Sequence, residues 1–396
     1  MMDDKIKQAL SAMAGQPPHV ADYSRRQFIA NAGRYGLTLA AAAALTQPFA
    51  FPAVALAADI ELPKVDSIPD KLKGSGTVRV CSYGGALQDA QRKAYFKPFE
   101  ELSGIKVIEA EGPDPAKVKA MVDSKAIEYD VTELDGGDVI NLSRHGDYFE
   151  PIDYSLFDVE NIDPVFRQKL YVNMLPYAQI YAYRTDAFKG KAPKDNKDLW
   201  DTVNFPGPRS LQSGASGSNA DLEVATMAAG VPPDKVYPID LDKAFASLAK
   251  IKPNVTKWWD AGAVPAQLLN DDEVVMATAW NGRIAAIQAN KAPVEIVWQD
   301  QLLRNDCWAV IKGAANAGNA QKFTAFITMA VPQARLSSLI PYGFVNNKSA
   351  GYLSPERLKL LPTAPDIKSK LINFNTQWWA DNMDDIVKRW SAFIVG

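Results

Sequence analysis

Histidine and cysteine are scarce in this sequence, with two of each among 396 residues. His145 is the histidine that lies beyond the N-terminal region, beside Arg144 and Gly146, which is typical of a surface loop. A Ser-His-Asp triad would need that loop to lie in a cleft. The metal-ligand spacings C-x-x-C and H-E-x-x-H are absent. The sequence therefore predicts no catalysis and no bound metal.

Nucleotide-binding signatures are also missing. The small-residue loop at residues 214–219 precedes an alanine-rich helix but lacks the Gly-Lys-Ser/Thr of a P-loop. We therefore interpret it as a loop whose Asn219 or Asp221 caps the helix. Because no other cofactor motif is present, we expect the protein to need no cofactor.

The charge and the hydropathy of the chain argue against a nucleic-acid-binding protein and against a membrane-spanning one. The formal charge is −3, and removal of residues 1–57 takes away five basic and three acidic residues, which leaves −5. A mildly acidic chain without a basic stripe argues against a nucleic-acid partner. Beyond the N-terminal region, no run reaches the roughly 18 apolar residues that a membrane span needs.

The N-terminal residues 1–57 predict export by the twin-arginine route. Arg25 and Arg26 stand in a Ser-Arg-Arg-Gln-Phe-Ile motif, an apolar run follows at residues 37–45, and Ala55-Leu56-Ala57 forms an A-x-A cleavage site. We expect a soluble periplasmic chain that begins at Ala58. The alternative is an uncleaved amphipathic segment.

Residues 77–107 predict the core architecture. Val78, Val80 and Cys81 form a short strand that Gly84-Gly85 ends at once. Apolar residues then recur at helical spacing over residues 86–102, and a second strand starts at residue 105. This β-α-β unit predicts an α/β fold with parallel strands, and a loop at a strand's carboxyl end where small polar ligands bind.

The same stretch resembles the opening of solute-binding proteins of ABC importers, especially the spermidine/putrescine-binding branch. Later segments extend the resemblance over essentially all of the chain beyond the signal peptide; they are Phe149-Glu150-Pro151-Ile152-Asp153, Leu175-Pro176-Tyr177, Trp258-Trp259-Asp260, Trp280-Asn281-Gly282-Arg283 and Asn305-Asp306-Cys307-Trp308. The resemblance implies a two-lobed type II periplasmic-binding-protein fold, in which each lobe is a mainly parallel sheet flanked by helices. The first lobe would span residues 74–178 plus 305–345 and the second residues 179–304 plus 346–396. The chain would cross between the lobes near Ala178 and Arg304, with the ligand in the cleft.

The resemblance also implies which residues contact the ligand. A polyamine needs aromatic faces along its stem and carboxylates at its ammonium groups. The candidates are Ser82, Tyr83, Asp135, Trp258, Trp259, Trp280 and Asp306, with Glu223 on a looser alignment. For Asp135 the alternative is a helix cap, and for the tryptophans it is the core.

Arg283 supports a different ligand. A guanidinium pairs with a carboxylate in a bidentate manner, which suits an ω-amino acid or an organic acid. The alternative role of Arg283 is a salt bridge on the helix that follows Trp280.

The resemblance implies ligand binding and transport rather than catalysis. The chain would capture a small amine, with a polyamine such as putrescine or spermidine preferred, and deliver it as a monomer to an ABC permease in the inner membrane. The lesser alternative is an exported α/β enzyme that acts on a small amine or acid. We expect Cys81 and Cys307 to be free thiols, because the family places them on strands that are not direct neighbours.

Overall fold

The structure is a computed structural model that describes residues 61–188, 190–215 and 219–395. The predicted twin-arginine motif and cleavage site lie outside these residues. The strands are β1 (Thr77–Ser82), β2 (Lys106–Glu111), β3 (Val131–Asp135), β4 (Val172–Arg184), β5 (Arg209–Gln212), β6 (Val255–Trp259), β7 (Met276–Trp280), β8 (Val294–Val310) and β9 (Ile372–Asn373). The helices are α4 (Gly85–Gln91), α5 (Lys97–Ser103), α6 (Pro115–Ser124), α7 (Gly136–Ser143), α8 (Asn196–Trp200), α9 (Leu222–Ala228), α10 (Leu241–Ile251), α11 (Val264–Asn270), α12 (Asn281–Ala289), α13 (Ala317–Ile327), α14 (Ala330–Leu339), α15 (Pro355–Leu358), α16 (Pro365–Lys368) and α17 (Thr376–Val395). No helix among them is both long and apolar enough to cross a membrane.

The predicted β-α-β unit is confirmed at β1, its helix and β2. β1 pairs with β2 in parallel, and the helix between them runs as α4, a π-helical turn over Arg92–Phe96, and α5. Gly104 ends this helix with φ +79°, a left-handed conformation that glycine adopts without strain. The Ser82–Gly85 loop therefore lies at the carboxyl end of β1, as the sequence predicts.

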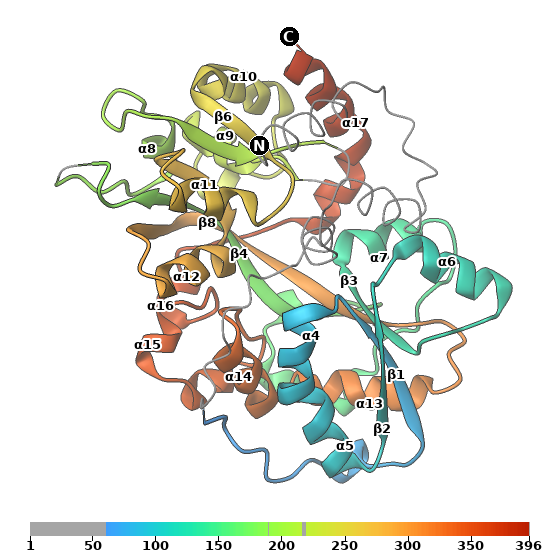
Figure 1. Ribbon diagram of the computed structural model, residues 1–396. Coiled ribbons are helices and arrows are strands. Elements are labelled where there is room, and N and C mark those ends of the chain that lie inside the picture. The colour runs from blue at the N-terminus through green and yellow to red at the C-terminus, as the bar shows by residue number, and fades with distance from the viewer. Residues whose placement is uncertain (1–60, 189, 216–218, 396) are drawn as a thin grey trace, which may run out of the picture. The chain divides into compact units, whose positions relative to one another are not determined.

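The strands form one continuous hydrogen-bonded path in the order β2-β1-β3-β8-β4-β7-β5-β6, and β9 pairs with β8. β1–β3 and β5–β7 pair in parallel within their own groups. β4 and β8 run antiparallel to each other, β8 runs antiparallel to β3 and β4 to β7, and the short β9 pairs with β8 in parallel. We expected a separate sheet in each lobe. The path is continuous because β4 and β8, of 13 and 17 residues, are long enough to belong to both groups, and Figure 1 shows them passing from the β1–β3 group to the β5–β7 group.

Each half of the sheet is covered by apolar residues on both faces. Val78, Phe99 and Trp308 belong to one cluster at the β1–β3 half, and Leu134 belongs to the cluster on its other face. Two further clusters flank the β5–β7 half, one of which includes Trp379 and Trp390 of α17. Trp379 and Trp390 are buried, and Trp378 packs against the same cluster while partly buried.

The two cysteines are buried and free, as predicted. Cys81 lies on β1 and Cys307 on β8, and β3 separates these strands. Burial raises the pKa of the Cys81 thiol to about 11, so the thiol stays protonated and unreactive at neutral pH.

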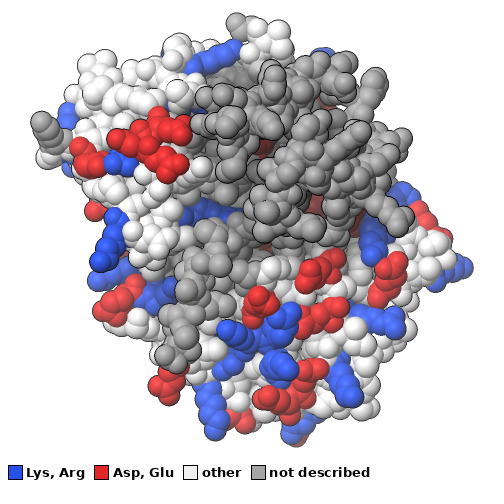
Figure 2. Space-filling model, viewed as in Figure 1, with Lys and Arg blue, Asp and Glu red and all other residues white. Residues whose placement is uncertain are grey.

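The remaining surface predictions concern charge and His145. His145 is exposed in a turn after α7, which confirms its predicted place. Figure 2 shows basic and acidic side chains interspersed over the described part of one face, without a field of one sign.

Candidate functional site

Two carboxylates face each other where β3 ends. Asp135 is the last residue of β3, and Asp306 of β8 is its antiparallel register partner. Directly opposed like charges destabilise a sheet. Burial, then the charge of Asp135, raises the pKa of Asp306 well above its usual range. Asp306 is only 4% exposed, and its carboxylate makes no hydrogen bond or ion pair with the other described residues. The charge of Arg304 lowers the pKa of Asp306 but does not cancel the rise.

Asp135, in contrast, is already engaged. One of its oxygens accepts a hydrogen bond from Gly137 N at 2.7 Å and so caps α7, which is the alternative role that the sequence suggested. The other oxygen lies 3.8 Å from Nη2 of Arg304. Asp135 therefore caps α7 and lies beside Arg304, whereas Asp306 makes no hydrogen bond or ion pair with the described residues.

Arg304 is the charged residue that our reading of the sequence had treated only as a crossing point. It is 5% exposed and pairs in register with Tyr177 of β4. Its Nη1 donates to Gln179 Oε1 at 3.0 Å, and its Nη2 donates to Asn219 Oδ1 at 2.6 Å. Its guanidinium carbon lies 4.2 Å from the ring centre of Phe374 and 5.7 Å from that of Tyr177. Arg304 thus joins β4, β8, the loop before α9 and, through Asp135, the end of β3.

Aromatic rings lie beside these charges. The ring centre of Tyr177 is 6.0 Å from that of Trp280 and 6.3 Å from that of Tyr342. Burial, then the charge of Asp306, raises the pKa of Tyr83 well above its usual range. Tyr177 and Tyr342 were missed as site residues because their contacts join segments that are far apart in sequence.

The first turn of α12 brings a second guanidinium to this region. Trp280 ends β7, and Asn281 fixes the turn by accepting from Ala178 N at 2.9 Å and donating to Pro341 O at 2.9 Å. Arg283 follows on the same turn and is 2% exposed. Burial lowers its pKa and nearby Tyr342 opposes the shift.

Tyr342 is close enough to both opposite charges for each of them to act on its pKa. Burial raises its pKa to about 12, while Arg283 lowers the pKa and Asp306 raises it further. A Cβ added at Gly282 would lie 2.8 Å from the Tyr342 ring, so the helix start and this ring are in close contact. The site therefore combines a carboxylate, a guanidinium and aromatic faces.

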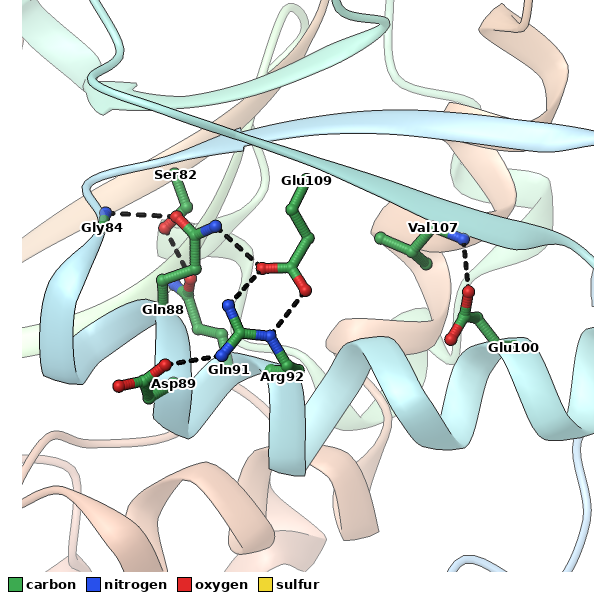
Figure 3. A network of polar contacts seen from close by, with 9 residues as sticks. All are labelled: Ser82, Gly84, Gln88, Asp89, Gln91, Arg92, Glu100, Val107 and Glu109. Carbon is green, nitrogen blue, oxygen red and sulfur yellow. Dashed lines mark hydrogen bonds and ion pairs between the residues drawn. The ribbon is translucent and has the colours of Figure 1, made fainter.

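A network of hydrogen bonds fixes the loop that carries Tyr83 (Figure 3). Gly84, with φ +78°, donates from its N to Gln88 Oε1 at 3.2 Å, and Gln88 donates to Glu109 Oε2 at 2.8 Å. Arg92 holds both oxygens of Glu109 at 2.6 Å. This bidentate pair ties the helix to β2, which restricts where the loop can place the Tyr83 ring.

Ser82 is placed differently from our expectation. Its hydroxyl is fully buried and lies 2.7 Å from Glu133 Oε2 and 2.5 Å from Gln91 Oε1. Burial raises the pKa of Glu133 to about 7, while hydrogen bonds from Ser82 and Gln91 oppose that shift. Ser82 thus serves an internal network behind Tyr83. Glu133 was missed, although an acid inside the apolar run of residues 129–134 was a signal for it.

Of three other candidates, Trp259 and Glu223 are buried and Trp258 is partly buried against a core cluster. Trp258 packs on Trp390 and Phe393 of α17, with ring centres 5.1 and 5.6 Å away. Trp259 is fully buried, donates to an internal threonine and meets the Trp280 ring edge-on at 5.8 Å, so it supports Trp280 from behind. Glu223 is fully buried and accepts from Trp379 Nε1 at 2.6 Å and from a tyrosine hydroxyl. The structure does not bring Trp258 or Glu223 beside Asp306.

Asp221 also differs from expectation. It stands at the start of α9, but its carboxylate makes no capping hydrogen bond and instead accepts from Gln179 Nε2, Gln212 N and Thr278 Oγ1 at 2.6–2.7 Å. The Asp221 carboxylate therefore joins β4, β5 and β7, and through Gln179 it is linked to Arg304.

Two surface hollows, near Arg357 and near Arg167, lie away from these charges and are not part of the site. The described residues contain no cluster of three acids, cysteines or histidines that could hold a metal ion.

Residues 94–362 match the family model described as bacterial extracellular solute-binding protein, and the chain belongs to this family. The gamma-aminobutyric acid-binding protein of Pseudomonas aeruginosa is 36% identical over 81% of this chain and 91% of its own. The spermidine/putrescine-binding periplasmic protein 1 of Haemophilus influenzae is 24% identical over 74% of this chain and 82% of its own.

Solved structures confirm the fold class. An ABC transporter substrate-binding protein from Bradyrhizobium japonicum matches with a TM-score of 0.74 and 34% identity over 81% of this chain and 99% of its own. The Atu4243–GABA receptor matches with a TM-score of 0.72 and 33% identity over 80% of this chain and 97% of its own. The type II periplasmic-binding-protein fold and the solute-binding family that the sequence predicted are therefore correct.

Proposed function

We propose that this chain is the periplasmic solute-binding component of an ABC importer and that its ligand is a small ω-amino acid of the 4-aminobutyrate class. The observation that carries the proposal is that two buried, opposite charges, Asp306 and Arg283, both act on the Tyr342 hydroxyl, whose ring also touches the helix start that carries Arg283. Asp306 would take an ammonium group and Arg283 a carboxylate. The likeness to a gamma-aminobutyric acid-binding protein supports the same ligand class.

The chemistry of the site fits such a zwitterion along its length. Asp306 has no hydrogen bond donor among the described residues, so a ligand ammonium would supply its missing partner. Arg283 can present two parallel donors to a ligand carboxylate. Tyr177, Trp280 and Tyr342 offer ring faces to the methylene stem between them.

A polyamine is the second candidate, and it is the ligand that the sequence alone favoured. The aromatic rings and the more distant spermidine/putrescine-binding relative support it. A bound polyamine, however, would be a dication close to two buried guanidinium groups, Arg283 and Arg304. Such like-charge contacts cost several kcal/mol. An organic acid would use Arg283 but would bring its negative charge to Asp306.

Delivery follows from the fold class. We infer that the lobes at residues 74–178 plus 305–345 and 179–304 plus 346–396 close over the ligand by bending at β4 and β8, and that the monomeric complex docks on the permease. We infer no reaction, and the relatives named above are described as binding proteins. Mass spectrometry of the ligand recovered after long incubation checks this, since release of an altered product would assign the chain to enzymes.

Export is the remaining part of the proposal. We infer that Arg25-Arg26 directs the precursor to the twin-arginine route, because that pair is read as an address rather than as charge. Replacing both by lysine should leave the precursor in the cytoplasm, as measured by cell fractionation. A normal periplasmic yield would show that the motif plays no part.

A thermal-shift screen followed by calorimetric titration tests the ligand class. The panel contains ω-amino acids of three to six carbons, the diamines of matching length and the matching dicarboxylic acids. At 100 times its dissociation constant, a true ligand adds about 2.7 kcal/mol to stability. The proposal expects the strongest shift from an ω-amino acid; a stronger shift from a diamine or from a diacid would overturn it.

A further inference from the structure

Three charges share one face of the sheet at the end of β3. Asp135 and Asp306 are register partners, so their Cβ atoms are about 4.5–5.5 Å apart. Arg304 lies two residues before Asp306 on β8 and therefore points to the same face. Each of these two neighbouring carboxylates could take an ammonium group, but the guanidinium of Arg304 already lies 3.8 Å from Asp135.

Arg304 is held in this position rather than free to leave. It donates to Gln179 and Asn219, and its plane lies over Phe374 at 4.2 Å. Gln179 in turn donates to Asp221 at 2.6 Å, so the side chain that holds Arg304 is itself held in place. A buried guanidinium with these contacts keeps its charge under all physiological conditions.

We propose that Arg304 is a specificity-determining residue that excludes diamines by occupying Asp135, the second carboxylate that a dication would need. The inference rests on the proposed function, because it explains how the site selects one ammonium group rather than two. With Arg304 in place, the two carboxylates and this guanidinium leave one unpaired negative charge, which matches a ligand with one ammonium. Without Arg304, both carboxylates would become available.

The variant that tests this is Arg304→Met, which keeps a long apolar stem against Phe374 and removes the charge. Because a like-charge contact costs several kcal/mol and 1.36 kcal/mol is tenfold, the association constant for 1,4-diaminobutane should rise at least about tenfold in Arg304→Met. The matched control is Arg304→Lys, which keeps the positive charge and should keep the exclusion. The double variant Arg304→Met/Asp135→Asn should lose the gain, because the second carboxylate is gone.

Calorimetric titration of each variant with 4-aminobutyrate and with 1,4-diaminobutane separates the outcomes. If the wild-type chain binds 4-aminobutyrate and Arg304→Met gains no diamine affinity, the inference on Arg304 fails while the proposed function stands. If the wild-type chain prefers the diamine, both fail. A gain that persists in the double variant also overturns the inference. Should Arg304→Met not fold, Arg304→Gln takes its place, since a glutamine can keep one hydrogen bond to Asn219.

Discussion

Replacing Asp306 by asparagine should affect ligand binding and stability in opposite directions. The substitution keeps the shape of the side chain and removes its charge. In the unliganded protein, Asp306 is a buried carboxylate that faces Asp135 and accepts no hydrogen bond from the described residues. Removing a buried charge of this kind relieves desolvation and like-charge repulsion, so we expect the unliganded variant to be more stable than the wild type.

Ligand binding should be lost in the same variant. Neutralising one side of a buried charge pair costs about 2–5 kcal/mol, which corresponds to a loss of roughly thirtyfold to several thousandfold in affinity. The melting temperature without ligand should rise by about 1.5 °C for each kcal/mol gained, scaled from the unfolding entropy per residue. Calorimetric titration and thermal denaturation measure the two quantities on one preparation.

The control is Asp66→Asn, which removes a carboxylate that is 75% exposed and paired only with a surface lysine. Exposed pairs contribute about 0–1 kcal/mol, so neither binding nor melting temperature should move appreciably. Unchanged ligand affinity in Asp306→Asn would refute the assignment of this residue to an ammonium group. A fall in the melting temperature of the unliganded variant would refute the reasoning about its buried charge.

Two further variants test groups around the site. Glu133→Gln should remove a pH dependence: because burial raises the folded pKa of Glu133 to about 7 from 4.5, its contribution to stability is complete below pH 4.5 and is lost as pH rises to about 7. At 1.36 kcal/mol per pKa unit, the free energy of unfolding of the wild type relative to the variant should fall by on the order of 3 kcal/mol between pH 4.5 and 8 in urea titrations, and equal slopes would contradict the role of Glu133. Gly262→Ala should displace the Trp280 ring, because a Cβ there would lie 2.4 Å from it, and should weaken ligand affinity about tenfold or more with a change in tryptophan fluorescence. Gly318→Ala, where the Cβ would meet nothing within 4 Å, is the control; equal effects of the two substitutions would show that Trp280 is not involved.

The strand ends of the site were predictable from the sequence because they depend on local pattern. An apolar run that stops at Ser82, Asp135 or Trp280 marks the end of a strand wherever that strand lies in the sheet. Asp306 was named from the family resemblance, and Arg283 from the chemistry of a guanidinium near the expected cleft. What the pattern could not decide was which face each side chain takes.

Trp258 and Trp259 show this limit. Neighbouring residues of a strand point to opposite faces, so at most one of the two could meet the cleft side. Trp259 supports Trp280, and Trp258 packs under α17, a helix more than a hundred residues further along the chain. Which tryptophan points where depends on the register of β6 with β5, a non-local property that no window of sequence contains.

Arg304 was beyond sequence reasoning for a related reason. Its partners Asp135, Gln179, Asn219 and Phe374 come from four separate segments, and only the order β3-β8-β4 brings them together. The sequence showed an arginine on a crossing strand but not the carboxylate beside it.

The buried charges of the site explain why binding of a ligand ammonium should stabilise the folded protein. Asp306 and Glu133 lie in the interior near one another, and the charge of Glu133 further raises the pKa of Asp306. Arg304 lies 3.8 Å from Asp135, and its charge also lowers the pKa of Asp306, but less than burial and the neighbouring carboxylates raise it. An ammonium group at Asp306 would lower that pKa, so at a pH where the free carboxyl is partly protonated, binding should release protons. Closure of the lobes would then be favoured by the ligand's own charge, since burying the carboxylate is costly only while it is unpaired.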